Sequence, residues 1–393
     1  MGRAERYRPG LWSSLLWSLL AVGGAILLVR YTRGLGAVTN LSDQFPWGLW
    51  VGFDVLCGVA LAAGGFTITT AVYVLNLKRF RPIVRPTILT AFLGYVLVVV
   101  ALLFDLGRPW NIWHPLVMWN PRSVMFEVSW CVMLYLTVLA LEFSGVVFER
   151  LGWGRALRLQ QAAAVPLVVA GALLSTLHQS SLGSFYLIVP GKLHVLWYSS
   201  LLPLLFLLSA VAAGLAMIIV EARLSARAFG RTLEMPLLTS VGRALFGALS
   251  VYGAVRLLDL ARLGVIGEAF ARTREAAFFQ LELALGVVIP MALLASPAMR
   301  RNSGRLYAAA LMVVAGLVVN RLNVSITGLE GALGGHYVPA AAEVIVTLML
   351  VAVGFAVFAL AARHLPIFPA VEAPGLTDRA AGAAMPTPVA VRP

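Results

Sequence analysis

Ionisable side chains interrupt the long apolar stretches of this sequence at a few places. His178 closes one such stretch in "STLHQSSLGSFY" (175–186), and Asp54, Glu127 and Glu282 lie inside others. Carboxyl and imidazole groups can form hydrogen bonds to a carbonyl oxygen and can exchange protons near neutral pH. Burying a charge in a membrane costs on the order of 3 kcal/mol on insertion scales, so residues of this kind are usually functional. We therefore interpret them as candidates for a site that binds a ligand and moves protons.

The composition is that of an integral membrane protein. Of the 393 residues, 60% are hydrophobic and 12% are charged, whereas about a quarter are charged in a soluble domain. Apolar runs of about 20 residues can cross a bilayer. They predict ten spans, of which the first is a retained helix rather than a cleaved signal peptide. The predicted spans are 11–30, 47–75, 86–105, 124–147, 163–184, 195–222, 239–260, 277–297, 306–322 and 339–363.

The net charge of +13 is distributed unevenly between the two sides of the predicted spans. The N-terminus, alternate loops and C-terminal tail hold 19 Lys and Arg residues, and the opposite loops and helix ends hold nine. Positively charged loops stay on the cytoplasmic side. The asymmetry predicts that both termini are cytoplasmic, and it explains the basic charge without a nucleic-acid partner.

With this orientation, most polar residues of the spans lie near the outer, non-cytoplasmic side. At a rise of 1.5 Å per residue they fall within roughly 10 Å of the outer interface. The inner side has fewer polar residues, namely Glu142 and Glu221 near helix ends and the mildly polar Thr67, Thr69 and Thr70. The outer layer consists of Asp54, Asp105, Glu127, His178, Gln179, Ser180, Ser181, His194, Trp197, Tyr198, Asp259, Glu282, Asn320, Arg321, Asn323 and Glu343.

Some residues of this polar layer also have a purely structural explanation. Asp105, Asp259 and Glu343 are so close to helix ends that solvation explains them equally well. Arg321 can pair with an acid such as Glu282 or Glu343.

The sequence predicts no bound haem, iron–sulfur cluster or metal. Cys57 and Cys131 fall within apolar spans and are interpreted as core residues; an iron–sulfur cluster takes about four thiolates. Only His178 and His194 are matched in depth, and a short loop separates their helices.

Several long motifs resemble one known family. They are "FPWGLWVGFDVLCG" (45–58), "DLGRPWNIW" (105–113), "SVMFEVSWCVMLYLTVLALEF" (123–143), "FERLGW" (148–153), "LHQSSLGS" (177–184) and "RHLPIFP" (363–369). They resemble the NrfD/PsrC family of quinone-interacting membrane subunits, and most of all the HybB-type membrane subunit of periplasm-facing nickel–iron hydrogenases. Val195 follows His194 where the hydrogenase pattern has a proline, which keeps a sister complex acting on sulfur compounds open as an alternative.

The resemblance implies a fold and a set of partners. The fold is all-α, with two four-helix bundles formed by spans two to five (about 47–184) and six to nine (about 195–322), and with flanking helices. The partners are a ferredoxin-like iron–sulfur subunit and catalytic subunits, the hydrogenase large and small subunits above all, on the periplasmic face. The chain would then be a multi-pass protein of the bacterial inner membrane, in contact with lipid. Residues 1–10 would be a cytoplasmic N-terminus, 11–363 the membrane domain and 364–393 a disordered cytoplasmic tail.

The family resemblance and the outer polar layer together predict a subunit that delivers electrons from its partners to a quinone, either menaquinone or ubiquinone. Reduction of a quinone takes two electrons and two protons, and the chain has no redox centre of its own in this interpretation. A proton translocator without quinone chemistry and a passive membrane anchor are the alternatives. The predicted quinone contacts are His178 at a carbonyl, Asp54 or Glu127 as proton donor, Asp105 and Arg108 at the entrance, and Trp47, Trp50 and Tyr186 around the ring. The predicted proton-transfer residues are Asp54, Glu127, Glu142, Glu221 and Glu282.

Overall fold

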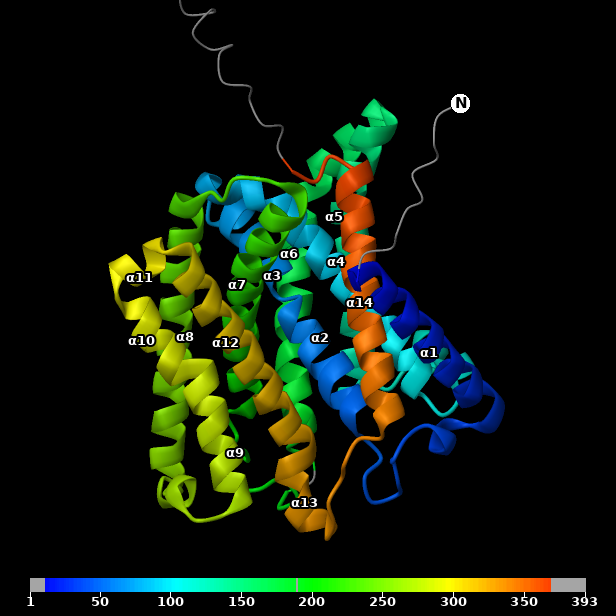
Figure 1. Cartoon of the computed structure of the whole chain (residues 1–393), viewed down its shortest axis with the longest axis vertical. Coiled ribbons are helices and arrows are strands. Elements are labelled where there is room, and N and C mark those ends of the chain that lie inside the picture. Colours follow the sequence, from blue (N-terminus) through cyan, green and yellow to red (C-terminus); the bar gives the residue numbers. More distant parts are fainter. Residues whose placement is uncertain (1–10, 189, 369–393) are drawn as a thin grey trace, which may run out of the picture.

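The computed structural model describes residues 11–188 and 190–368, and every regular element in these residues is helical (Figure 1). The predicted N-terminal segment 1–10 and most of the predicted tail, 369–393, lie outside the described residues. Within the described residues, ten helical stretches are long and apolar enough to cross a membrane. They match the ten predicted spans.

Seven of the ten spans are built on one long α-helix each. These are α1 (Leu11–Arg33), α4 (Arg81–Asp105), α5 (Val124–Leu151), α6 (Gly154–Phe185), α7 (Leu202–Phe229), α8 (Met235–Leu263) and α14 (Ala341–His364). Local signals set several of their ends. Ser123 accepts a hydrogen bond from the Phe126 amide at the start of α5. Gly152 follows the same helix with a positive φ of 71°, a conformation that glycine adopts without strain.

The second, eighth and ninth spans are interrupted by π-helical turns. The second contains η2 (Trp50–Val55), α2 (Leu56–Leu61), α3 (Gly64–Thr69) and η3 (Thr70–Val74). The eighth contains α9 (Arg274–Leu283), η8 (Ala284–Val288) and α10 (Ile289–Ala295), and the ninth contains α12 (Ser303–Leu322), η9 (Asn323–Thr327) and α13 (Gly328–Leu333). Such turns are frequent at functional sites, and here Asp54 lies within one of them.

Short elements complete the described chain. They are the 3₁₀ turns η1 (Leu35–Ala37), η4 (Lys78–Phe80), η5 (Pro109–Asn111), η6 (His114–Leu116) and η7 (Gly267–Phe270), and the helical turn α11 (Pro297–Arg301).

Several predicted boundaries are wrong. The fifth span begins at Gly154 rather than 163. The sixth span begins at Leu202 rather than 195, because Pro203 is favoured in the first turn of a helix and the preceding residues form turns. The ninth continues through η9 to Leu333, so Asn323 lies within the span rather than at its end. The predicted tail does not begin at 364, since Ile367 is fully buried.

Helix α7 lies at the centre of the packing. It contacts α2, α3 and α6 on one side and α8 and α12 on the other. The backbones of α7 and α3 meet closely, since a Cβ atom on Gly214 would lie 2.4 Å from the Gly64 nitrogen. The division of the spans into two four-helix bundles is compatible with these contacts and stays an interpretation.

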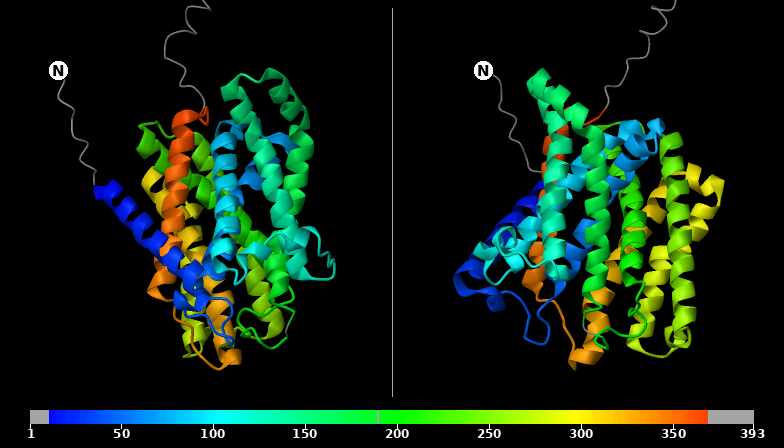
Figure 2. Two further views of the ribbon diagram at one scale, coloured as in Figure 1. Left: turned by 90° about the vertical axis from the view of Figure 1, so that its right-hand side faces the viewer. Right: turned by 180° about the vertical axis from the view of Figure 1, so that it is seen from behind.

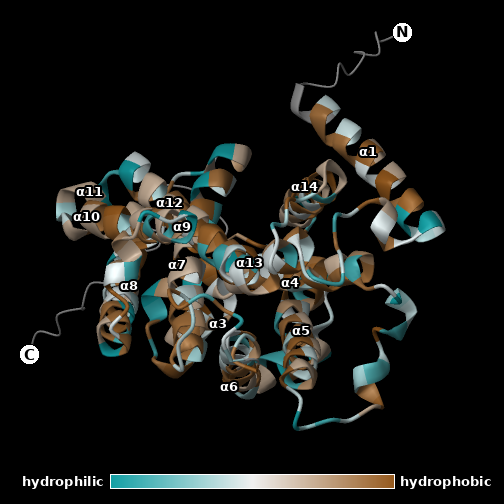
Figure 3. Ribbon diagram, turned by 90° about the horizontal axis from the view of Figure 1, so that it is seen from below, coloured by the Kyte–Doolittle hydropathy of each residue, from teal (hydrophilic) through white to brown (hydrophobic). Residues whose placement is uncertain are grey.

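Helices α1 and α14 flank the packed body. Helix α14 contacts α4, and α1 contacts α14 before its N-terminal end leans away from the other helices (Figure 2). Hydrophobic residues cover the sides of the peripheral helices in the view along their axes (Figure 3). Leu173 and Leu258, for example, are 61% and 70% exposed. Surfaces of this kind are suited to contact with lipid.

Candidate functional site

A cavity of about 590 Å³ runs between the second span, α4, α7 and α14. We call it the groove. Phe53 and Asp54 line it at one end, and Phe229 and Ala359 line it at the other, near the ends of α7 and α14. Most lining side chains are aliphatic or aromatic, so an elongated apolar molecule would be accommodated here.

Asp54 is the carboxyl group at the first end of the groove. It lies in the π-helical turn η2, and its residue surface is 8% exposed. The Thr347 hydroxyl of α14 donates a hydrogen bond to its Oδ2 atom at 3.3 Å. No ion pair to Asp54 is found in the described part of the chain. A carboxyl group in this position can offer a hydrogen bond or a proton to a ligand in the groove.

Glu221 lines the groove on α7, closer to the second end. It accepts a hydrogen bond of 2.6 Å from Ser225, one helical turn further along. The groove therefore carries one carboxyl group at its Asp54 end and another on the wall toward its opposite end, with an apolar stretch between them.

His178 lies in a closed polar centre and is not among the residues that line the groove. Its side chain is fully buried, and both ring nitrogens have partners. Nε2 shares a hydrogen bond of 2.5 Å with the Tyr95 hydroxyl, and Nδ1 is 2.8 Å from the Leu174 carbonyl oxygen. The adjacent Gln179 donates to the Val59 carbonyl at 3.0 Å, which joins α6 to α2.

Several buried oxygens near this centre and inward of it have no hydrogen-bond partner in the described chain. They are the Tyr135 hydroxyl, Ser175 Oγ, Gln179 Oε1 and Glu142 Oε1. Buried polar groups are normally hydrogen-bonded, so these four atoms are positions at which a further polar group would be stabilised. Glu142 is thus a buried carboxyl group with one oxygen that has no hydrogen-bond partner, and its role in proton transfer stays a prediction.

Glu127 is exposed, although the sequence placed it among the deeper polar residues. It lies in the first turn of α5, which begins at Val124 as predicted. The Ser181 hydroxyl donates a hydrogen bond of 2.7 Å to it. Glu127 is not a groove residue.

Asp105 and Arg108 do not line the groove either. Asp105 ends α4, and its Oδ1 atom is buried without a hydrogen-bond partner. Arg30 of α1 donates from Nε to the Phe104 carbonyl at 2.7 Å, and thereby satisfies one of the free carbonyls at the end of α4. Arg108 is exposed in the following turn.

The three predicted aromatic residues surround the outer part of the second span. Trp47 packs on Phe185 with ring centroids 4.5 Å apart. Trp50 is buried, and its indole nitrogen donates to the Glu343 carbonyl at 3.1 Å. Tyr186 is also buried, at the end of α6. None of the three lines the groove, so their contacts in this structure are with the protein.

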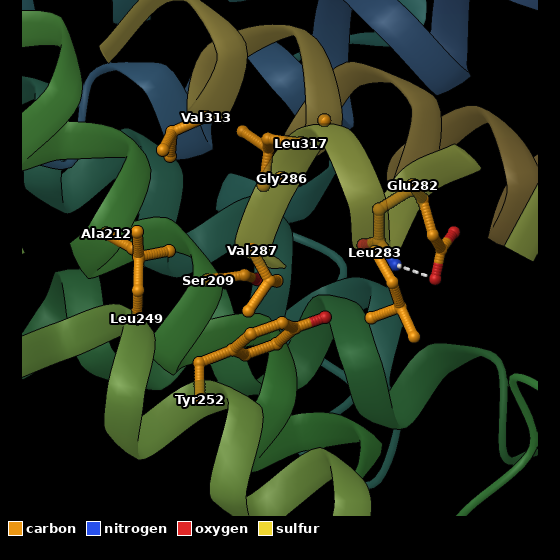
Figure 4. Close-up of a pocket in the computed structure, with 12 residues that line it drawn as sticks. Ser209, Ala212, Leu249, Tyr252, Glu282, Leu283, Gly286, Val287, Val313 and Leu317 are labelled. Atoms are coloured by element: carbon orange, nitrogen blue, oxygen red, sulfur yellow. Dashed lines mark hydrogen bonds between the residues drawn. The ribbon is translucent and has the colours of Figure 1, made fainter. Parts of the chain in front are cut away.

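Glu282, which lines the pocket drawn in Figure 4, also belongs to a separate buried cluster in the later spans. It accepts hydrogen bonds from three groups: Trp197 at 3.1 Å, Asn320 at 3.2 Å and Asn323 at 2.7 Å. We call these four residues the Glu282 cluster. The adjoining cavity is only about 30 Å³, lined among others by Tyr252 and Glu282. It is too small for a quinone.

Arg321 is joined to Glu282 through an amide rather than by direct contact. It donates to Asn320 Oδ1 at 2.8 Å, and its guanidinium lies 3.7 Å from the centre of the Phe206 ring. It also donates to Ser209 at 2.9 Å. The prediction that Arg321 pairs with an acid is therefore wrong, since no ion pair of Arg321 is found in the described residues.

A second polar network joins the ends of the last three spans to the segment between α13 and α14. Arg274 contacts Glu330 at 2.7 Å, and His336 contacts the same oxygen at 3.0 Å. The Tyr337 hydroxyl donates to Glu343, and burial raises the pKa of Tyr337 above its usual range. The contact ties the connecting segment to the start of α14.

Sequence reasoning missed several of these partners. Thr347 and Tyr95 lie in long helices and Glu330 lies in the short helix α13, and none of them has a motif around it. Tyr95 is the one residue with a polar atom in its side chain in the run "YVLVVVALL". This isolation was the only sequence signal for its role. No group of three or more His, Cys, Asp or Glu residues suited to a metal is found in 11–188 and 190–368.

The family model described as "Polysulphide reductase, NrfD" matches residues 37–330. The chain is 33% identical to the probable Ni/Fe-hydrogenase 2 b-type cytochrome subunit of Escherichia coli, over 89% of this chain and 91% of that protein. It is 30% identical to the integral membrane subunit of menaquinone reductase from Nitratidesulfovibrio vulgaris, over 91% of this chain and 92% of the relative. A further protein of that organism is 37% identical over 89% of this chain and 92% of its own length.

Proposed function

The chain belongs to the polysulphide reductase NrfD family, and from this premise we propose that it binds a quinone in the groove and supplies protons for its reduction. It is an integral inner-membrane subunit of a quinone-linked oxidoreductase. The menaquinone reductase relative favours menaquinone as the substrate. Electrons would come from partner subunits, because the chain offers no redox centre of its own in this account.

The groove with Asp54 at its end is the observation that carries the proposal. A quinone has an apolar ring system with two carbonyl oxygens, and its reduction consumes two electrons and two protons. The apolar walls would hold the ring, and the Asp54 carboxyl group would donate a hydrogen bond and then a proton to one carbonyl oxygen. Thr347 would hold the carboxyl group in place through the contact to Oδ2.

His178 has a different place in this proposal. A direct contact between His178 and a quinone stays a prediction, and it requires one of the two hydrogen bonds of the imidazole to be exchanged. We assign the Tyr95–His178 pair to the protein behind the groove, where it holds α4 and α6 together and can pass a proton. Glu127 would transfer protons at the exposed outer surface, and Arg108 would lie near the entrance for the quinone.

Proton translocation is the second candidate function. Glu221 lines the same groove as Asp54, and Glu142 is buried without a hydrogen-bond partner for one oxygen. These two carboxyl groups could take up protons from the side opposite to Asp54. Quinone reduction would then draw protons across part of the membrane.

We further propose that the partners are a ferredoxin-like iron–sulfur subunit and the catalytic subunits of a nickel–iron hydrogenase, on the periplasmic side. The name of the Escherichia coli relative supports the hydrogenase assignment, and the menaquinone reductase relative supports a sister complex. The outer position of Asp54 depends on cytoplasmic termini. Reporter fusions after Arg363 and within 264–275 should report opposite sides, and the same side for both would refute this orientation.

A spectroscopic titration of the purified chain tests the proposed binding. Because both nitrogens of His178 are engaged by the protein, we expect no Soret band, although one relative is named a b-type cytochrome subunit. Addition of a naphthoquinone should quench tryptophan fluorescence saturably, with one quinone per chain. Asp43→Asn, an exposed acid outside the groove, is the matched control for Asp54→Asn, which should weaken the quenching.

Two results would contradict the proposal. A stoichiometric Soret band that is lost in His178→Ala and His194→Ala would show a haem protein. Quenching that does not saturate, or that is equal in Asp54→Asn and the unaltered chain, would remove the assigned quinone site.

A further inference from the structure

We infer that the groove holds the hydrocarbon tail of a long-chain quinone, with the tail running from Asp54 toward the ends of α7 and α14. This inference rests on the proposed function and extends it from the head group to the tail. It assigns tail recognition to the groove residues that lie farthest from Asp54, among them Ala228 of α7 and Ala359 of α14.

The groove is long and follows the helices. On α7 its lining residues extend from Met217 to Phe229, which is about 18 Å at the α-helical rise. On α14 they extend from Leu350 to Ala359, or about 14 Å. An aromatic head group alone would leave most of this length unfilled.

The walls have the chemistry of a hydrocarbon site. Of the lining side chains, those with polar atoms are Asp54, Thr90, Glu221 and Ser225. The hydroxyl of Thr90 is engaged by the Pro86 carbonyl, and the carboxyl group of Glu221 accepts from Ser225. Asp54 is therefore the polar lining residue at the outer end that can still form a hydrogen bond to a ligand.

Glycine residues bring the helices of the groove together. A Cβ atom on Gly354 of α14 would lie 2.7 Å from a Leu97 methyl group of α4. A Cβ atom on Gly58 would lie 2.7 Å from a Val98 methyl group, between the second span and α4. Close packing at these points makes α14 a wall of the groove rather than a loosely attached outer helix.

The outer end of the groove selects the kind of head group. Among the described residues that line the groove there is no Lys or Arg to pair with a phosphate, and a buried anion without a partner is unfavourable. A quinone carbonyl is neutral and accepts a hydrogen bond from the protonated Asp54 carboxyl group. The observations therefore favour the tail of a quinone over the acyl chain of a phospholipid that enters from the same end.

The test compares quinones with and without a tail in the intact complex. Ala359→Trp fills the far end of the groove, 305 positions along the chain from Asp54. Ala356→Trp is the matched control on the same helix, because Ala356 is exposed and does not line the groove. We expect Ala359→Trp to raise KM at least tenfold for a long-chain menaquinone and less than twofold for 2,3-dimethyl-1,4-naphthoquinone. Ala356→Trp should change neither value.

A second variant covers the case in which Ala359→Trp does not assemble. Ala228→Phe enters the same end of the groove from α7, and the same tail-dependent rise in KM is expected. An equal effect on both quinones, or none on either, would overturn the inference. So would loss of co-purified phospholipid at unchanged KM, which would make the groove a phospholipid site.

Asp54→Asn separates this inference from the proposed function. It should impair both quinones, because it acts at the head group. If Asp54→Asn impairs both and the far-end variants show no tail dependence, only the tail inference fails. If Asp54→Asn impairs neither, the proposed quinone site itself fails.

Discussion

Asp54→Asn should lower quinone-linked turnover of the intact complex about a hundredfold, while the partner subunits keep their activity with a soluble dye. Asparagine preserves the size of the side chain and can still accept the hydrogen bond from Thr347, but it has no proton to give. Positioned proton transfer contributes typically 10²–10⁴-fold to a rate. The expected loss is therefore in kcat, and it is measured with a long-chain menaquinone in native membranes.

Two controls define what the Asp54 result means. Asp43→Asn, on the exposed segment before the second span, should leave turnover unchanged. Thr347→Val removes the group that orients the carboxyl, so we expect a smaller loss than for Asp54→Asn. Normal quinone-linked turnover in an assembled Asp54→Asn complex would exclude Asp54 as the proton donor.

Glu282→Ala should destabilise the chain by about 3–5 kcal/mol, because each buried donor that is left without an acceptor costs about 1–3 kcal/mol. Three buried donors, from Trp197, Asn320 and Asn323, would lose their acceptor. Arg321 would lose the support of Asn320 as well. The measurement is the apparent melting temperature of the purified chain in detergent, together with the yield of assembled complex.

Glu282→Gln and Glu268→Ala complete this experiment. Glutamine keeps one acceptor oxygen, so its melting temperature should lie between that of the unaltered chain and that of Glu282→Ala. Glu268 is exposed in the η7 turn, and its replacement should have no effect. An unchanged melting temperature in Glu282→Ala would show that the cluster is not structural, and would return Glu282 to the candidates for proton transfer.

Long apolar runs were sufficient to predict the helices, because a membrane span has to bury about 20 consecutive residues in hydrocarbon. The errors arose where tertiary contacts decide the local structure. Residues 195–198 are apolar and aromatic, yet Trp197 is fully buried in a turn and donates to Glu282. That contact joins positions 85 residues apart, which no local pattern encodes.

Asp54 could be singled out from the sequence, but the direction in which the polar side chains face could not be predicted. Asp54 was identified from its position in an apolar span, and it does line the groove. Glu127 and His178 were expected beside it, but the first is exposed and the second is enclosed by its own partners. Helix rotation decides which way a side chain faces, and rotation is set by packing between helices. Thr347 meets Asp54 across 293 residues of sequence, so α14 could not have been assigned to the site in advance.

Photoaffinity labelling of the intact complex with an azido-naphthoquinone, followed by peptide mapping, tests quinone binding in the groove most directly. The account predicts labelled peptides from 53–62 and 350–355, which line the groove near Asp54, and competition by unlabelled menaquinone. Labelling should be reduced in Asp54→Asn. Label found instead on the peptides around His178 or Glu282, and absent from 53–62 and 350–355, would contradict the account.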